Sequence, residues 1–348
     1  MINLNLSTYN LLTNIPDSFT VSGVTDTADI TVILNDVDIF GTTLFAYNGV
    51  VTFYSLRDLV MQHMRANTLP FVKLRIKAEH PSAEYSNEVY IVYCDYGKEN
   101  ITDADFLSGS FLTIRTYMRI PSEATGQISF FATGAETAYA DCILMVNGHS
   151  IMQKVPLTVP SSTYPAVITL DVSPETIKQK VFAMGVITTA QLKSYSVYVG
   201  ERAITYYVNE QQPEITMTFR NAFNVEEYIY IYGATTEITE VDRQEAICQG
   251  RTQFYNQKVK HRYNVVTETL GIAEAKWYNE LFASDFVFTK VDGATKRILI
   301  TDITSEIKDA TNETTKMRFT WFFDNDWAYI SHNPTIGIFT NPYNRVYE

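Results

Sequence analysis

Apolar and polar residues alternate along most of this chain, and the alternation predicts a mainly β protein. The stretches 28–40, 71–80 and 87–97 switch between the two classes with the period of two that half-buried strands show. Such runs recur with turn residues roughly every 8–15 positions, which is typical of sandwiches and barrels. The expected fold is therefore a multi-domain chain of β-sandwich-like modules.

Three short stretches depart from this pattern and predict helices. Residues 55–67 carry an apolar stripe at helical spacing, with Ser55 as a plausible N-cap. Residues 173–185 have a proline in the first turn and a glycine as a stop. Residues 272–284 form the clearest amphipathic segment of the chain.

Hairpin turns are expected at Asn48-Gly49, Asn147-Gly148 and Asp292-Gly293, because tight primed turns need a positive φ at both central residues. Residues 244–270 are expected to supply one or two long strands. No fixed-period repeat is visible, which argues against propellers and solenoids.

The order of elements divides the chain into four parts. Residues 1–100 form a β-rich unit with one helix, and residues 101–213 form a sandwich-like unit. Residues 214–330 are expected to form strands, a helix, a hairpin and a final strand, in that order. Residues 331–348 are expected to form an extended arm.

One strand, within residues 219–233, has an apolar set on each face. Tyr228, Tyr230 and Tyr232 share one face, whereas Ile229 and Ile231 share the other. Either both faces are buried within the subunit, or the tyrosine face covers a neighbouring subunit. We predict a contact surface from the large aromatic residues of this region, namely Phe219, Phe223, Tyr228, Tyr230, Tyr232, Trp321 and Trp327.

Composition and charge narrow the function classes. A net charge of −12 opposes an extended grip on nucleic acid, and the basic residues of 256–264 read as one solvated strand face. The start lacks the features of a secretory signal, and no apolar run is long enough for a membrane span. Cys94, Cys142 and Cys248 are far apart, which fits synthesis in a reducing compartment.

Motifs for catalysis and cofactor binding are missing from the sequence. No two of the five histidines have metal-ligand spacing, and neither a nucleophile elbow nor a phosphate-binding loop occurs. Cys94 and Cys142 lie in apolar strand runs, where a buried and inert thiol is expected. With 39 acidic residues, a glycosidase-like carboxylate pair is neither visible nor excluded. We expect no enzyme, no cofactor and no small-molecule substrate.

Residues 266–323 have a strand, a helix with Trp277, Leu281, Phe282 and Ser284, a hairpin at Asp292-Gly293, then "ILITD" and "RFTWFF". This order resembles the C-terminal module of virion proteins from phages and prophages of Bacteroidetes bacteria. Residues 219–233 and 47–64 are similar to further segments of the same group. The resemblance implies tail-tube-like β modules in a tail, baseplate or connector ring. It also implies that the partners are copies of this chain and neighbouring virion proteins, in a virion assembled in the host cytoplasm.

Two other functions stay open from the sequence. A glycan-binding or adhesin sandwich would use exposed tryptophan or tyrosine rings against sugar faces. A hydrolase with dispersed carboxylates would need a cleft that brings two of them together.

Overall fold

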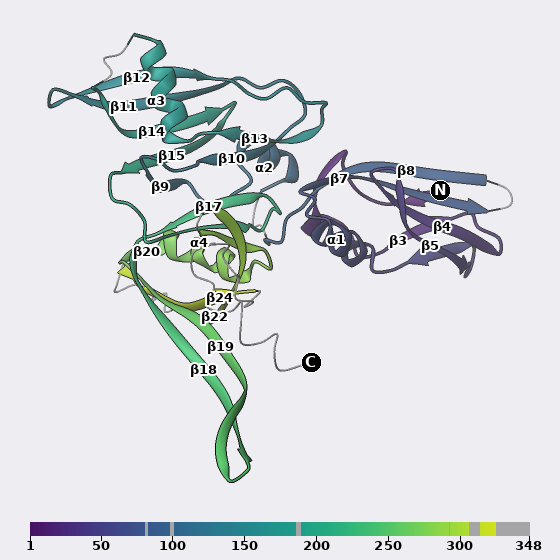
Figure 1. The fold of residues 1–348 in the computed structure, drawn as a ribbon. Coiled ribbons are helices and arrows are strands. Elements are labelled where there is room, and N and C mark those ends of the chain that lie inside the picture. The colour runs from purple at the N-terminus through teal and green to yellow at the C-terminus, as the bar shows by residue number, and fades with distance from the viewer. Residues whose placement is uncertain (81–82, 98–100, 186–188, 292, 306–313, 325–348) are drawn as a thin grey trace, which may run out of the picture.

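The structure is a computed structural model that describes residues 1–80, 83–97, 101–185, 189–291, 293–305 and 314–324. It confirms the mainly β fold, because strands dominate every part of the chain (Figure 1). Three units can be followed in chain order, and we call them the N-terminal, middle and C-terminal units.

The N-terminal unit combines two sheets and a helix. A five-stranded sheet has the order β2-β8-β7-β4-β5, and a three-stranded sheet has the order β1-β3-β6. Its elements are β1 (Ile2–Asn3), β2 (Tyr9–Leu11), the 3-10 turn η1 (Leu12–Asn14), β3 (Phe19–Ser22), β4 (Thr27–Leu34), β5 (Val37–Phe45), β6 (Val50–Phe53), α1 (Leu56–Ala66), β7 (Phe71–His80) and β8 (Ala83–Val92).

The middle unit also has two sheets, of five and two strands. The larger has the order β12-β11-β14-β15-β9, with β9 parallel to β15, and the smaller pairs β10 with β13. Its elements are α2 (Asp103–Gly109), β9 (Tyr117–Pro121), β10 (Gln127–Ala132), β11 (Ala138–Val146), β12 (His149–Leu157), β13 (Ala166–Asp171), α3 (Pro174–Ala183), β14 (Gln191–Val199) and β15 (Arg202–Asn209).

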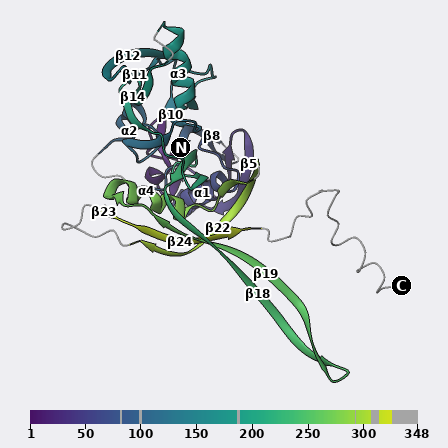
Figure 2. The same ribbon diagram turned by 60° about the vertical axis from the view of Figure 1, so that its left-hand side comes forward.

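The C-terminal unit is a seven-stranded sheet with the order β17-β16-β21-β22-β24-β19-β18, and the short pair β20–β23 lies beside it. The two strands at the end of this order, β19 and β18, extend out of the sheet as a long hairpin (Figures 1 and 2). Its elements are β16 (Ile215–Arg220), β17 (Glu226–Ile231), β18 (Gly233–Cys248), β19 (Arg251–Thr267), β20 (Leu270–Gly271), α4 (Ile272–Ala283), β21 (Val287–Val291), β22 (Ala294–Ser305), β23 (Thr314–Thr315) and β24 (Met317–Phe323).

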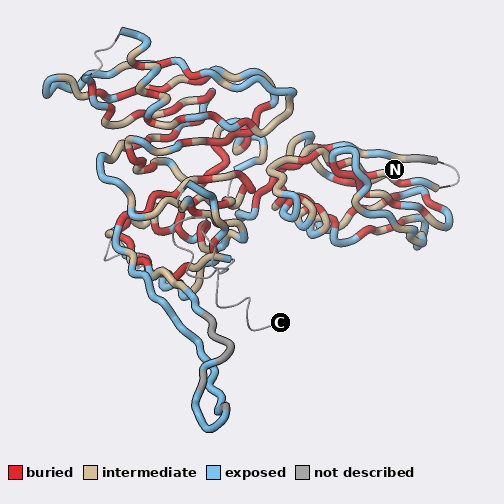
Figure 3. Tube along the Cα trace, in the orientation of Figure 1, coloured by how far each residue is buried: buried red, intermediate tan, exposed pale blue. Residues whose placement is uncertain are grey.

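The hydrophobic cores do not follow the three units one to one. The N-terminal unit has its own core, built on residues such as Val60 and Leu74. A single continuous core extends from the middle unit, for example Leu144, into the C-terminal unit, for example Leu281 (Figure 3). A third, small cluster that includes Leu11 and Phe223 joins the N-terminal unit to the other two.

Polar contacts reinforce that junction. The side-chain Nδ2 of Asn224 donates to the carbonyl oxygens of Met64 and Leu69, both at 3.0 Å. The guanidinium of Arg65, in the last turn of α1, lies 2.5 Å from the carboxylate of Asp285. These contacts fix the end of α1 against the C-terminal unit.

The predicted helices are all present as α1, α3 and α4. Ser55 precedes α1 as predicted, but it has a left-handed backbone with a φ of +62°, and its side chain makes no capping bond. The short helix α2 was not predicted, although Thr102 caps it by accepting a hydrogen bond from the Asp105 amide at 3.1 Å.

The turn predictions hold for the residues that the structure describes. Asn48 and Gly49 have φ values of +50° and +79°, and Asn147 and Gly148 have +48° and +82°. Gly293 has a φ of +80° in the hairpin between β21 and β22, whereas Asp292 lies outside the described residues. The predicted extended arm, residues 331–348, also lies outside them.

Candidate functional site

The most exposed feature of the molecule is the hairpin of β18 and β19, which we call the arm. The two strands pair with each other from Gly233–Thr267 to Cys248–Arg251, around a turn at Gln249 and Gly250. β19 pairs with β24 only over Tyr263–Val266, at the base of the arm. Beyond that base, both edges of the two-stranded ribbon lack a partner strand among the described residues.

The arm exposes apolar side chains as well as polar ones. Every residue from 236 to 247 is exposed. Ile247 is 78% exposed and Phe254 is 58% exposed, and the exposed set also includes Ile238, Val241 and Val259. An isolated two-stranded hairpin is marginally stable in water, because it buries little apolar surface. The arm thus combines exposed apolar side chains with little burial of its own.

The two strands of the arm carry opposite charges. β18 contains four acidic residues against a single arginine, whereas β19 contains only basic charges, from Arg251 to Arg262. Arg262 Nε lies 3.2 Å from the Glu240 carboxylate, and His261 Nδ1 lies 3.0 Å from that of Glu237. The predicted basic face therefore lies on the arm, where Arg262 forms a cross-strand ion pair.

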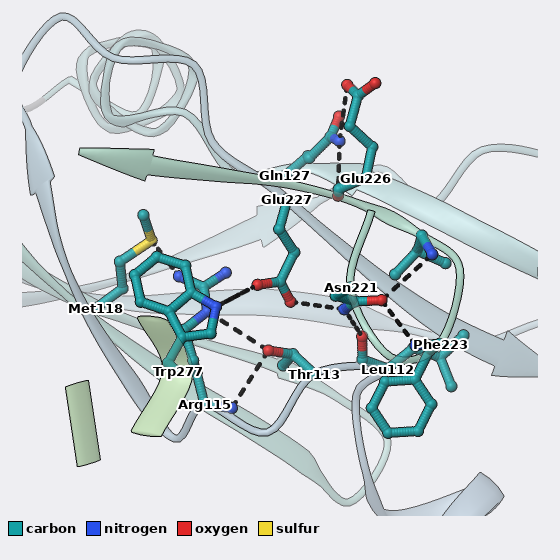
Figure 4. A network of polar contacts seen from close by, with 11 residues as sticks. Leu112, Thr113, Arg115, Met118, Gln127, Asn221, Phe223, Glu226, Glu227 and Trp277 are labelled. Atoms are coloured by element: carbon teal, nitrogen blue, oxygen red, sulfur yellow. Dashed lines mark hydrogen bonds and ion pairs between the residues drawn. The ribbon is translucent and has the colours of Figure 1, made fainter. Parts of the chain in front are cut away.

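A second polar feature is a buried network at the start of β17, centred on Glu227 (Figure 4). Trp277 Nε1 donates to Glu227 Oε2 at 2.7 Å, and Arg115 Nε lies 3.3 Å from the same oxygen. Asn221 Nδ2 donates to Glu227 Oε1 at 2.9 Å. The Arg115 guanidinium also covers the Trp277 ring, 4.2 Å from its centroid.

This network ties the middle unit to the C-terminal unit. Asn221 Nδ2 also donates to the carbonyl of Leu112, at 2.8 Å, and its Oδ1 accepts from the amide of Phe223, at 2.9 Å. Both oxygens of Glu227 are used, so the buried charge is paired and solvated by the protein. Neither oxygen of Glu227 is therefore left free for proton transfer.

Sequence reasoning missed this network, although a signal was present. Glu227 shares its strand face with Ile229 and Ile231, which are both buried. A carboxylate on a face of that kind has to find a partner inside the protein, because burying it alone is costly. Its partners Arg115 and Trp277 come from distant segments, so the sequence could not name them.

The predicted contact aromatics lie mostly inside the subunit. Phe219, Phe223, Tyr230, Tyr232 and Trp321 are buried, Tyr228 is half-buried, and Trp327 lies outside the described residues. In this conformation the five buried rings have no exposed face that could contact a neighbouring subunit. Their position agrees with the alternative that both faces of the strand are buried within the subunit. Burial within one subunit does not favour these five residues as contacts, and the predicted contact surface stays a prediction.

The middle unit covers the tyrosine face. The hydroxyl of Tyr230 donates to the carbonyl of Thr125, and the guanidinium of Arg119 lies 5.7 Å from the centroid of the Tyr232 ring. Desolvation raises the pKa of both tyrosines. The row of tyrosines is thus an internal seam between the two units that share a core.

Tryptophan rings are also enclosed. Trp321 stacks on Tyr263 with 4.1 Å between ring centroids, and Trp277 is 6% exposed. Neither offers an open ring to a sugar, whereas Tyr47 and Tyr54 in the N-terminal unit are 80% and 68% exposed.

Among the described residues, the side chains that could bind a metal ion or act as a nucleophile do not come together at one site. No three His, Cys, Asp or Glu side chains gather to hold a metal ion within the described ranges. Cys94 and Cys142 are buried, as predicted, and burial raises the pKa of the Cys142 thiol to about 12. A thiol with that pKa remains protonated at neutral pH and is a poor nucleophile. No helix in the described part of the chain is long and apolar enough to cross a membrane.

Comparison with known proteins does not assign the chain to a family. No family model matches the sequence, and no curated protein is similar to it. Among solved structures, a plexin A4 extracellular region matches with a TM-score of 0.21 and 10% identity, over 94% of this chain and 40% of that chain. A bacterial ice-binding adhesin matches with a TM-score of 0.16 and 12% identity, over 93% and 97%. The chain spans less than half of the plexin chain, and likenesses this distant carry no functional argument.

Proposed function

We propose that this protein is a structural subunit of a bacteriophage virion, which assembles through subunit contacts into a tail, baseplate or connector ring. The observation that carries the proposal is the arm, a ribbon of two long strands whose edges, beyond its base, pair with no other strand of the described chain. The virion assignment itself rests on the sequence resemblance described above. Partners are other copies of the chain and neighbouring virion proteins.

The charges of the arm favour contact between copies in a head-to-tail order. β18 is acidic and β19 is basic, so the β18 edge of one arm is complementary to the β19 edge of the next. Contacts of this heterologous kind close into rings when the rotation between neighbours permits. Strand pairing would supply backbone hydrogen bonds, and apolar residues such as Ile247 and Phe254 would be desolvated.

Shortening the arm tests this proposal. In the variant, Asn-Gly replaces residues 240–260 and joins Thr239 to His261, which already face each other across the ribbon. The intact chain is expected to form multi-subunit particles in light scattering and electron microscopy. The shortened chain should remain a folded monomer, because none of the removed residues whose side chains the structure describes belongs to a hydrophobic core.

Point variants distinguish a loss of contact between subunits from a loss of folding. Ile247→Glu together with Phe254→Glu should reduce the particle mass without changing the thermal midpoint. The matched control is Met152→Glu, which alters an exposed apolar residue, 73% exposed, on β12 of the middle unit. A strictly monomeric intact chain at high concentration, or a shortened chain that assembles as well as the intact one, would overturn the proposal.

A further inference from the structure

A pocket of about 300 Å³ lies where the N-terminal unit meets the C-terminal unit. The N-terminal unit contributes Arg65, Tyr93, Asp95 and Tyr96 to its wall. The C-terminal unit contributes the turn between β16 and β17 and the end of α4. This volume is at the lower end of the range found for small-ligand sites.

One buried carboxyl in the wall of this pocket lacks a partner. Glu280, near the end of α4, is 5% exposed, and neither of its carboxyl oxygens has a hydrogen bond from the described residues. The Tyr96 hydroxyl faces this carboxyl but makes no hydrogen bond of ordinary geometry to it. Glu227 differs, because all of its acceptor oxygens are used.

The groups around Glu280 explain its electrostatic state. Burial is the main cause that raises its pKa to about 8, and the nearby Glu227 carboxylate raises it further. Arg115 and Tyr96 act in the opposite direction. Arg115 is already paired with Glu227, so two buried carboxyls share one buried guanidinium. In the free chain Glu280 is therefore mostly protonated at neutral pH.

The other charges that line the pocket cancel, so that an ionised Glu280 would leave it with one net negative charge. Asp95 and Asp285 line it together with Glu280, against the guanidinium groups of Arg65 and Arg220. Arg65 is paired with Asp285, and Arg220 Nη1 donates to the carbonyl of Asn224 at 3.3 Å. The end of α4 borders the pocket as well, and the C-terminus of a helix favours cations.

We propose that this pocket binds an organic cation, an ammonium or guanidinium group on a short aliphatic stem, which pairs with Glu280. The cation would supply the hydrogen-bond donors that this carboxyl lacks and would compensate its buried charge. Two sources share this chemistry: a free amine or guanidine compound, and a lysine or arginine side chain of a second copy of the chain. The proposal is independent of the virion assignment.

Calorimetric titration of the full chain with n-butylammonium chloride or methylguanidinium chloride tests the proposal. Both salts should bind at pH 8 and bind more weakly as the pH falls, because Glu280 must lose its proton. Between pH 8 and pH 6 the affinity should fall about fiftyfold, in line with the ionised fraction of a carboxyl with a pKa of about 8. Neutral n-butanol at the same concentration should not bind.

Glu280→Gln is the decisive variant, since it keeps the shape of the side chain and removes the charge. It should weaken binding of both cations at least tenfold, whereas Glu175→Gln, the same change on an exposed part of α3, should leave binding unchanged. Equal binding by Glu280→Gln, or binding of n-butanol as tight as that of the cation, would overturn the proposal and leave a pocket filled by water.

Sedimentation distinguishes the two sources of the cation. If a second copy supplies the side chain, n-butylammonium should compete with it, and both the salt and Glu280→Gln should lower the particle mass relative to an equal concentration of sodium chloride. If the ligand is a free amine, the mass should stay the same while the calorimetric binding persists.

Discussion

At the scale of single residues, the two buried glutamates show how the surroundings decide the state of a side chain. Glu227 has an arginine, a tryptophan and an asparagine as partners, whereas Glu280 has none of ordinary geometry. Burying a carboxylate without partners is costly, so Glu280 keeps its proton at pH values where an exposed glutamate has lost it.

This difference predicts how stability depends on pH. From the ordinary pKa of 4.5 up to about 8, the folded chain holds a proton on Glu280 that the unfolded chain releases. The free energy of unfolding should therefore fall as the pH rises, by about 1.4 kcal/mol per pH unit from this group. Glu280→Gln lacks this loss, so its stability relative to the natural chain should grow between pH 5 and pH 8.

Denaturant unfolding at pH 5, 6.5 and 8 measures this effect, with Glu175→Gln as the variant that should follow the natural chain. A constant stability difference between Glu280→Gln and the natural chain across that range would contradict the assigned state of Glu280.

Residue patterns predicted local geometry well and burial less well. Asn-Gly pairs identified two turns because the φ requirement is local. The cover of Tyr230 and Tyr232 could not be identified, because it comes from a segment more than a hundred residues earlier, at Thr125 and Arg119.

At the scale of elements, the arm shows what alternation can and cannot predict. The sequence indicated one or two long strands in residues 244–270, yet period-two alternation does not reveal whether a neighbouring strand lies alongside. The helices α1, α3 and α4 were predicted because each spans at least ten residues with an apolar stripe or a proline start. The seven residues of α2 are too few for that signal.

Gly233, at the base of the arm, permits a prediction at this scale. It has a φ of +150°, and a Cβ atom there would lie 2.9 Å from Thr267 Cα and closer still to the Val266 carbonyl oxygen. Gly233→Ala should therefore lower the free energy of unfolding by about 2 kcal/mol or more, through backbone strain and steric overlap.

The matched variant is Gly41→Ala on β5, where nothing lies within 4 Å of the added methyl group. It should change stability by less than about 1 kcal/mol in the same denaturant titration. Equal effects of the two substitutions would show that the base of the arm tolerates a side chain.

At the scale of the whole molecule, the cores group the chain differently from its strand order. The sequence suggested separate units at 101–213 and 214–330, and those boundaries remain predictions. The structure packs both into one continuous core, whereas the N-terminal unit has its own. Sequence order could not reveal this, because the shared core is formed by contacts between segments far apart in the chain.

Calorimetry should accordingly resolve two unfolding transitions. Leu144→Ala in the middle unit and Leu281→Ala in the C-terminal unit should lower the same transition, and Leu74→Ala in the N-terminal unit should lower the other. Each change removes a fully buried leucine and should cost about 2–5 kcal/mol. If Leu144→Ala and Leu281→Ala shifted different transitions, the continuous core would not act as one cooperative unit.

The length of the arm has a consequence for the spacing of subunits. The twelve residues of β19 from Arg251 to Arg262, beyond the four that pair with β24, extend roughly 40 Å at about 3.3 Å per residue. A tether of that reach could touch a copy whose main body lies well apart. In the proposed assembly, the distance between neighbouring subunits would then be determined by the length of the arm. The width of the rest of the subunit would not limit that distance.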